Sequence, residues 1–269
     1  MRFVTFDAGQ GPRAGVLRDG DKVVEAGRSL RDLIAVNRLA EPADAQEIPL
    51  SDVQLLPPIP NPDKIICIGL NYRSHAEEAG VEAPEVPTFF AKFRNALVPA
   101  GAEVQLPAAS QKVDYEAEVA FVVGKRAKDV SEDDALGYIA GYTLLNDLSA
   151  RDLQFATPQW LPGKVFDGSA PCGPALVTPD EAGAHDSIGI ELKLNGEVMQ
   201  SATTADLIHS VPVLLSHLST LMTLEPGDIV STGTPSGVGS VREPRVWLKP
   251  GDEVEISSPS LGTLRSRLI

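Results

Sequence analysis

The feature that most constrains this chain is a pair of glutamates, one residue apart, in a run that is otherwise mainly apolar. Glu116 and Glu118 lie within residues 113–123, where valine, alanine, tyrosine and phenylalanine dominate. This composition favours a strand, and side chains two residues apart in a strand point the same way. The pattern predicts a strand over residues 115–123 that brings both carboxylates to one spot. Tyr115, Ala117 and Val119 would then face away.

Two carboxylates held this close raise each other's pKa unless a cation lies between them. Asp147, after Asn146, ends a second apolar run that begins at Tyr138 and predicts another strand. Three carboxylates from two strands would form an all-oxygen site of the kind that suits Mg²⁺ or Mn²⁺. A different interpretation is that Glu116 and Glu118 lie on the solvent-exposed face of an edge strand.

Composition narrows the class of protein. The chain has 269 residues, of which 43% are hydrophobic and 22% charged, as expected of a globular protein with a substantial core. Its net charge of -14 argues against binding to DNA, RNA or an anionic membrane surface. We expect a cytoplasmic protein, because the sequence shows no apolar run of membrane-spanning length and no signal peptide, and because Cys67 and Cys172 make no disulfide framework.

Predicted strands outnumber predicted helices. Residues 1–55 form a small N-terminal module with strands over 2–6, 13–18 and 22–25 and a helix over 30–37. A proline-rich connector over 56–62 leads into a second domain, residues 60–269. Its strands are predicted over 64–68, 88–93, 115–123, 138–146, 175–178, 190–194, 228–231 and 253–257, with Asn195-Gly196 as a hairpin turn. Its short helices are predicted over 74–79, 133–136, 150–156 and 211–220. Because helices do not alternate regularly with the strands, the fold class is mainly β (α+β), a roll or sandwich.

One histidine stands where a general base would be useful. His75 follows the predicted strand 64–68 in a short helix for which Ser74 is a suitable N-cap. Glu78 is three residues later, so the two side chains share a helix face and can hydrogen-bond. A carboxylate bonded to an imidazole fixes its tautomer and raises its basicity. The alternative is that the pair belongs to a solvated, charge-rich first turn.

Cationic and polar side chains near these elements are candidates for contacts with a substrate. Lys92 interrupts an apolar run, and Lys164 follows the turn Trp160-Leu161-Pro162-Gly163. An ammonium beside a metal can hold a carboxylate or stabilise a developing enolate oxygen, although a lysine more commonly extends to solvent. Arg151 and Gln154 are three residues apart at the start of a predicted helix and face one side.

The loop over residues 231–239 contains three glycines, several hydroxyls and Thr234. Glycines allow close backbone approach, and successive amides can cradle an anionic oxygen. It matches neither the Walker A pattern nor Gly-x-Gly-x-x-Gly, and a tight structural turn would look similar.

Taken together and in order, these segments resemble the fumarylacetoacetate hydrolase family over residues 60–269. The matching segments are Gly69-Leu70-Asn71-Tyr72 with His75-x-x-Glu78, Phe90-Ala91-Lys92, Asp114-Tyr115-Glu116-Ala117-Glu118, Asn146-Asp147 with Arg151 and Gln154, Trp160-x-x-Gly163-Lys164, and the loop 231–239. The resemblance implies a mixed β roll, a homodimer, and one Mg²⁺ or Mn²⁺ per subunit in a shallow pocket.

The resemblance also implies a role for each matched residue. Glu116, Glu118 and Asp147 correspond to the metal ligands. His75 and Glu78 correspond to a catalytic dyad on a lid, with Lys164 beside the reacting oxygens. The groups that contact the substrate are Lys92, Arg151, Gln154 and Thr234.

The implied reaction is metal-dependent hydrolysis of a C–C bond in a 2,4-dioxo acid, of the acylpyruvate or fumarylpyruvate type, through an enolate. The same site suits decarboxylation of oxaloacetate or isomerisation of a 2-hydroxydienoate. A binding protein without turnover is a further alternative, but His75, Glu78 and Lys164 beside the three ligands argue against it. The expected partner is a small 2-oxo acid.

Overall fold

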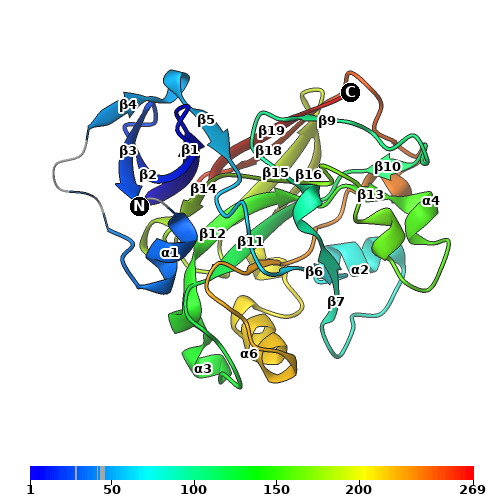
Figure 1. Cartoon of the computed structure of the whole chain (residues 1–269). Helices are drawn as coiled ribbons and strands as arrows, with labels where there is room; N and C mark the ends of the chain where they lie inside the picture. Colours follow the sequence, from blue (N-terminus) through cyan, green and yellow to red (C-terminus); the bar gives the residue numbers. More distant parts are fainter. Residues whose placement is uncertain (28, 41, 43–45) are drawn as a thin grey trace.

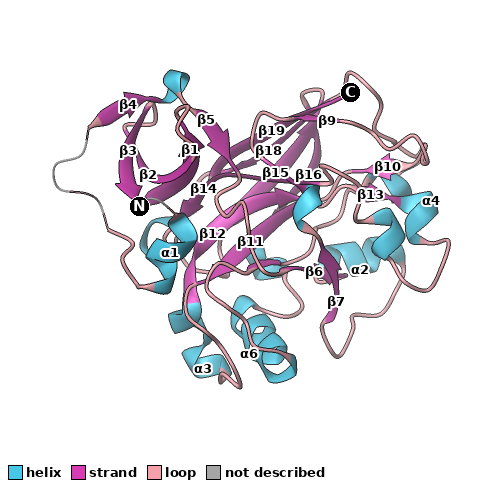
Figure 2. Ribbon diagram, viewed as in Figure 1, coloured by secondary structure: helices cyan, strands magenta, loops and turns pink. Residues whose placement is uncertain are grey.

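The computed structural model describes residues 1–27, 29–40, 42 and 46–269 and shows a mainly β chain with few, short helices (Figures 1 and 2). The predicted N-terminal module includes residues 28, 41 and 43–45, which lie outside the described part. No helix among the described residues has the length and apolar character needed to span a membrane. The mainly β content with few, short helices confirms the predicted fold class.

One large sheet runs through the molecule. Its strands, in spatial order, are β4 (Glu47–Pro49), β3 (Lys22–Gly27), β2 (Pro12–Arg18), β1 (Arg2–Asp7), β14 (Ala170–Val177), β12 (Ile139–Asn146), β11 (Ala117–Val123), β17 (Ile229–Ser231), β6 (Ile65–Gly69) and β7 (Thr88–Lys92). In addition, β5 (Gln54–Leu56) pairs with β1, and β8 (Leu97–Val98) pairs with β14. The sheet is mixed, because β17 and β6 are parallel whereas β11 is antiparallel to both of its neighbours.

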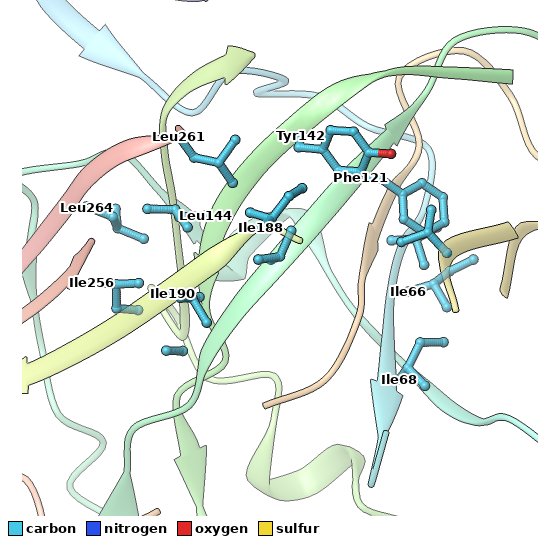
Figure 3. Packing of buried hydrophobic residues seen from close by; sticks show 14 of the residues in the cluster. Ile66, Ile68, Phe121, Tyr142, Leu144, Ile188, Ile190, Ile256, Leu261 and Leu264 are labelled. Carbon is cyan, nitrogen blue, oxygen red and sulfur yellow. The ribbon is translucent and has the colours of Figure 1, made fainter. Parts of the chain in front are cut away.

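A second sheet of five strands packs against the first. It contains β16 (Glu197–Thr203), β15 (Gly189–Leu194), β18 (Glu253–Ser258), β19 (Gly262–Leu268) and β9 (Glu103–Val104). Figure 3 shows Leu144 of β12 beside Ile190, Ile256 and Leu264 of this sheet. The predicted Asn195-Gly196 turn joins β15 to β16, and both of its residues have positive φ, as such a turn requires.

The helices lie at the margins of the sheets (Figure 2). They are α1 (Leu30–Ala35), α2 (Arg73–Ala79), α3 (Glu132–Ala135), α4 (Arg151–Gln154), α5 (Pro179–Ala182) and α6 (Val211–Leu221). Single 3₁₀ turns are η1 (Leu50–Asp52), η2 (Arg94–Ala96), η3 (Leu136–Tyr138), η4 (Leu161–Gly163), η5 (Thr204–Asp206) and η6 (Gly239–Val241). A two-stranded ribbon of β10 (Val113–Asp114) and β13 (Ser149–Ala150) lies next to α4.

The two faces of β11 belong to two different cores. Val119, Phe121 and Val123 pack toward the five-stranded sheet. Ala120 and Val122 face the opposite side, in a core that α1 and the N-terminal strands help to cover. Glu116 and Glu118 continue this second series, so the strand period directs both carboxylates to the end of the second core.

Several boundaries differ from those predicted, and three of the differences have a clear physical reason. The N-cap of α2 is Tyr72, so the prediction of Ser74 is wrong; Ser74 lies inside the helix and its hydroxyl donates to Asp206. The strand predicted over 175–178 begins at Ala170, because its prolines and Gly173 resemble a turn in the sequence. The strand predicted from Tyr115 begins at Ala117, since the amides of Glu116 and Ala117 donate to the side chains of Asn146 and Gln200.

The close approach of β12 to β14 can be tested with a matched pair of glycines. A methyl group on Gly141 would lie 2.4 Å from the carbonyl oxygen of Val177, whereas one on Gly137 would meet no atom within 4 Å. We expect Gly141→Ala to lower the free energy of unfolding by about 1–3 kcal/mol. Gly137→Ala should be neutral or stabilising by up to about 1 kcal/mol. Equal urea midpoints for the two variants would contradict this packing.

Candidate active site

The three predicted metal ligands come together at the end of the second core. Glu116 precedes β11, Glu118 lies within it, and Asp147 follows β12. All three side chains are buried, and one carboxylate oxygen from each lies within 4.8 Å of the others. The interpretation that the glutamates lie on a solvent-exposed edge strand is wrong, because β11 is paired on both sides.

Two buried lysines compensate part of this negative charge. Lys164 donates from Nζ to Glu116 Oε2 at 2.8 Å and to Asp147 Oδ2 at 2.9 Å. The Lys92 ammonium lies 2.7 Å from Asp147 Oδ1 and donates to the backbone carbonyls of Leu148 and Lys164. Buried charges persist only when they are paired and hydrogen-bonded in this way.

The two glutamates differ in protonation tendency. Burial alone would raise the pKa of Glu116, but the nearby charges of Lys164 and Arg151 outweigh it and lower this pKa to about 2. For Glu118, burial and the negative charges of Asp147 and Glu116 act together and hold its pKa well above the usual range. The ionised form of Glu118 is therefore the one that the protein's own cations stabilise least.

This donor set fits a hard divalent cation. The three ligand atoms are carboxylate oxygens, which Mg²⁺ and Mn²⁺ prefer over softer donors. The raised pKa of Glu118 indicates that a further positive charge would be favourable at this point. Glu116, Glu118 and Asp147 would hold such an ion, with Lys164 beside it.

Asp114 fixes the position of Arg151. Arg151 donates from Nε to Asp114 Oδ2 at 2.9 Å, its Nη2 lies 2.7 Å from Glu116 Oε1, and its Nη1 donates to Gln154 Oε1 at 3.0 Å. Asp114 also accepts the backbone amides of Gly239 and Ser240. Asp114 thus joins the arginine to the segment that follows the glycine-rich loop.

The amides of the glycine-rich region bind carboxylates of the chain itself. Gly233 donates to Glu118 at 3.1 Å, and the Ser231 hydroxyl donates to the same oxygen. Gly237 donates to both oxygens of Glu78, at 2.9 and 3.0 Å. The loop that was predicted to bind an anionic oxygen thus donates its amides to the carboxylates of Glu118 and Glu78, which border the site.

His75 and Glu78 lie near each other on α2, as the helical spacing predicts. His75 Nδ1 is 3.5 Å from Glu78 Oε2, which is a long contact compared with the bonds from Gly237 to Glu78. The helix itself is held at its start, where Arg73 Nη1 donates to the Leu207 carbonyl at 2.8 Å.

A cavity of about 580 Å³ opens above the carboxylates. Of the residues singled out from the sequence, those that line it are His75, Glu116, Glu118, Arg151, Gln154, Lys164 and Thr234. Asp147 lies beneath them. Lys92 is not among the described lining residues; it is buried behind Asp147, so its position suits support of a ligand better than contact with a substrate.

Several side chains that shape the site have roles that the sequence does not indicate. Phe90 lies under the Lys164 ammonium, which is 4.8 Å from the ring centroid, and meets Trp160 edge to face. Gly69 makes room for this tryptophan, because a methyl there would lie 2.4 Å from the indole ring. Gln200, from β16, donates to the Thr234 hydroxyl at 2.8 Å. Only contacts between distant segments reveal these roles.

The chain is similar to known protein families and to curated proteins. Residues 64–269 match a family model described as fumarylacetoacetate (FAA) hydrolase, C-terminal, and residues 1–58 match one described as Rv2993c-like, N-terminal. A mitochondrial oxaloacetate tautomerase of Bos taurus is 42% identical over 238 residues, which are 88% of this chain and 76% of that protein.

Two solved structures share the whole fold. The fumarylacetoacetate hydrolase from psychrophilic Exiguobacterium antarcticum is 32% identical with a TM-score of 0.90. The 5-carboxymethyl-2-hydroxymuconate delta-isomerase from Mycobacterium smegmatis is 33% identical with a TM-score of 0.86. Each comparison covers 100% of this chain and 99% of the other. These relatives carry three different reaction names.

The role of Lys92 behind the site can be tested through stability. We expect Lys92→Met to lower the free energy of unfolding by about 3–5 kcal/mol, because Asp147 would lose one of its two buried cationic partners and the carbonyls of Leu148 and Lys164 would lose their donor. Mn²⁺ should stabilise this variant more than the parent protein, since the added cation replaces part of the lost charge. Urea unfolding with and without Mn²⁺ measures both effects.

Lys128→Met is the matched control, because Lys128 pairs with Asp129 at the surface, where such a pair contributes about 1 kcal/mol or less. If Lys92→Met cost no more than this control, the buried pair would not support the site.

Proposed function

Because the chain belongs to the fumarylacetoacetate hydrolase family, we propose that it is a divalent-metal-dependent enzyme that transfers a proton on the enol form of a 2-oxo acid, as a tautomerase or isomerase. The observation that carries the proposal is that one cavity combines His75 with Arg151, Lys164 and the carboxylates. His75 is the only histidine among the described lining residues. Imidazole is the side chain that gains and loses protons near neutral pH.

The polar wall supports binding of the 2-oxo acid head. Arg151 and Gln154 offer N–H donors on one side of the cavity, and Thr234 offers a hydroxyl. A bound Mg²⁺ or Mn²⁺ would supply Lewis-acid polarisation of the substrate's oxygens. The Lys164 ammonium, held by Glu116 and Asp147, would donate a hydrogen bond to the oxygen that gains charge when the enolate forms.

His75 would accept the proton from the carbon next to the carbonyl carbon and return it to the enolate oxygen, and the reverse transfers would convert the enol to the 2-oxo form. Burial lowers the pKa of Lys164, but Asp147 and Glu116 outweigh burial and raise this pKa above its usual range, so the lysine stays charged and is a poor proton acceptor. His75 is therefore better suited than Lys164 to accept the proton. Phe90 and Trp160 would exclude water from the reacting atoms.

Hydrolysis of a C–C bond in a 2,4-dioxo acid is the second candidate. It requires His75 to take a proton from water while Glu78 orients the imidazole, and the presence of Glu78 beside His75 favours it. We rank it second because Glu78 is bonded more closely to the Gly237 amide than to His75. In both reactions an enolate is the common feature.

The first experiment is a panel of reactions on purified protein with Mg²⁺, Mn²⁺ or a chelator. The panel holds enol-oxaloacetate and a 2-hydroxydienoate, followed by absorbance, and acetylpyruvate and fumarylpyruvate, followed by pyruvate release. We expect metal-dependent loss of the enol or diene absorbance. Pyruvate release from the acylpyruvates at a comparable rate would favour hydrolysis, and carbon dioxide from oxaloacetate would indicate decarboxylation. Turnover that is unaffected by the chelator would contradict metal dependence.

Two variants separate the role of the proposed base from that of a proposed metal ligand. His75→Ala should lower kcat by about 10²- to 10⁴-fold, the usual contribution of a general base, and leave Mn²⁺ affinity largely unchanged. Asp147→Asn should instead weaken Mn²⁺ binding, as measured by calorimetric titration. Full turnover in His75→Ala would show that another group moves the proton.

Glu78→Gln tests the dyad. We expect it to lower hydrolysis more than tautomerisation, because only hydrolysis needs an oriented base for water. Glu77→Gln is the matched control, since Glu77 is an exposed neighbour on the same helix. Equal losses of rate in hydrolysis and tautomerisation would show that Glu78 does not act specifically in orienting the base for water.

A further inference from the structure

Gln200 is a buried side chain that has no part in the chemistry proposed above. It belongs to β16, at the edge of the five-stranded sheet, and only 2% of its surface is exposed. The described partners of its side-chain amide nevertheless lie on β11 and in the glycine-rich loop, next to the carboxylates. A buried amide at such a junction constrains its partners, because each of its hydrogen bonds has a fixed direction.

The orientation of this amide follows from its partners. Gln200 Oε1 accepts the amide of Ala117 at 2.9 Å, and Nε2 donates to the Pro235 carbonyl at 2.9 Å and to Thr234 Oγ1 at 2.8 Å. A backbone N–H can only donate and a carbonyl can only accept, so the oxygen and the nitrogen of the Gln200 amide cannot exchange places. Both hydrogens on Nε2 are therefore engaged.

The Thr234 hydroxyl is left with its own hydrogen free. Its oxygen accepts from Gln200, and within the described part of the chain this hydroxyl makes no other hydrogen bond. The hydroxyl hydrogen must point away from the Nε2 donor, and Thr234 lines the cavity. Thr234 therefore presents a hydrogen-bond donor to the cavity.

This donor lies beside the carboxylates. Thr234 follows Gly233, whose amide donates to Glu118 at 3.1 Å, and both Thr234 and Glu118 line the cavity. Ala117, the backbone donor to Gln200, stands between the two glutamates in the chain. One amide thus links the strand that carries two candidate metal ligands to the loop that carries the hydroxyl donor.

The backbone next to Gln200 is held against the same loop. Arg242 donates from Nη2 to the Met199 carbonyl at 2.6 Å and from Nε to the Gly237 carbonyl at 3.0 Å. A methyl group on Gly237 would lie 2.1 Å from the Met199 oxygen, so the loop touches β16 directly. These contacts set the position of the Gln200 amide relative to Thr234.

We propose that Gln200 is a positioning residue that fixes the Thr234 hydroxyl as a hydrogen-bond donor to an anionic oxygen of the bound acid. The proposal rests on the proposed function, because that function places an acid beside the carboxylates. A donor whose direction is already fixed does not have to reorient when the acid binds. Its hydrogen bond to a charged acceptor is also stronger than one between neutral groups.

Binding of pyruvate in the presence of Mg²⁺ measures this role without turnover. The chain's two tryptophans, Trp160 and Trp247, both line the cavity, so intrinsic fluorescence reports its occupancy. We expect Thr234→Val to weaken pyruvate binding about 10-fold, as the loss of a hydrogen bond to a charged group would, and Thr234→Ser to keep most of the affinity. Gln200→Met, which removes the donor to Thr234, should weaken binding roughly 3- to 10-fold.

A double-mutant cycle separates positioning from a merely structural role. If Gln200 acts through the Thr234 hydroxyl, Gln200→Met should have little further effect on pyruvate affinity in Thr234→Val protein. Thr204→Val is the matched control, because Thr204 is buried just after β16 and its hydroxyl accepts the Ile188 amide at 2.9 Å, outside the described cavity lining. This control should lose stability and keep its affinity for pyruvate.

Neutron diffraction from crystals of the parent protein in D₂O shows the hydroxyl directly. We expect the deuterium of Thr234 Oγ1 on the cavity side of the oxygen, with both deuterium atoms of Gln200 Nε2 directed at Thr234 and Pro235. A hydroxyl deuterium directed at Gln200 would overturn the proposal. So would unchanged pyruvate affinity in Gln200→Met, or additive effects of the two substitutions. Failure of the parent protein to bind pyruvate would overturn the proposed function, and the deuterium position would then decide the role of Gln200.

Discussion

Three buried carboxylates that repel one another determine how this site is built. Glu116, Glu118 and Asp147 come within 4.8 Å because the strand period and the pairing of β11 with β12 leave them no other direction. The fold offsets the repulsion with Lys92, Lys164 and Arg151, and with amides from the glycine-rich loop. The carboxylate whose ionised form is least stabilised is Glu118, whose pKa is raised. A further cation at this point would stabilise that ionised form.

Local patterns were sufficient to predict much of this arrangement. The alternation through residues 115–123 placed both glutamates on one face, and the helical spacing placed His75 beside Glu78. The Asn195-Gly196 turn and the strands β6, β7, β11, β12, β15, β17 and β18 follow from short-range preferences that the tertiary structure does not override, whereas the sequence did not predict β8, β9, β10, β13 or β19. The ordered set of motifs predicted the family, and the family models match residues 64–269 and 1–58. The division of the chain at residues 55–60 remains a prediction; β1 pairs with β14, so the N-terminal strands extend the large sheet.

What the sequence could not predict depends on contacts between distant segments. The sequence does not indicate that the Lys92 ammonium lies 2.7 Å from Asp147 Oδ1, and its predicted contact with a substrate stays a prediction. The loop over 231–239 resembles an empty anion cradle, yet Glu118 and Glu78 occupy its amides. Asp114 belongs to a matching segment, but the sequence does not indicate that it joins Arg151 to the backbone at Gly239 and Ser240. Each of these roles depends on which charged or polar group lies next to the side chain in the fold. The register between strands that are distant in the sequence determines that neighbour.

Anomalous diffraction at the manganese edge would show whether Glu116, Glu118 and Asp147 form one metal site. Crystals grown with Mn²⁺ should give a single anomalous peak per chain, within coordination distance of all three carboxylates, with the Lys164 ammonium beside it. A peak bound by other residues, or the absence of a peak in crystals of protein that turns over its substrate, would mean that these carboxylates are not the metal ligands.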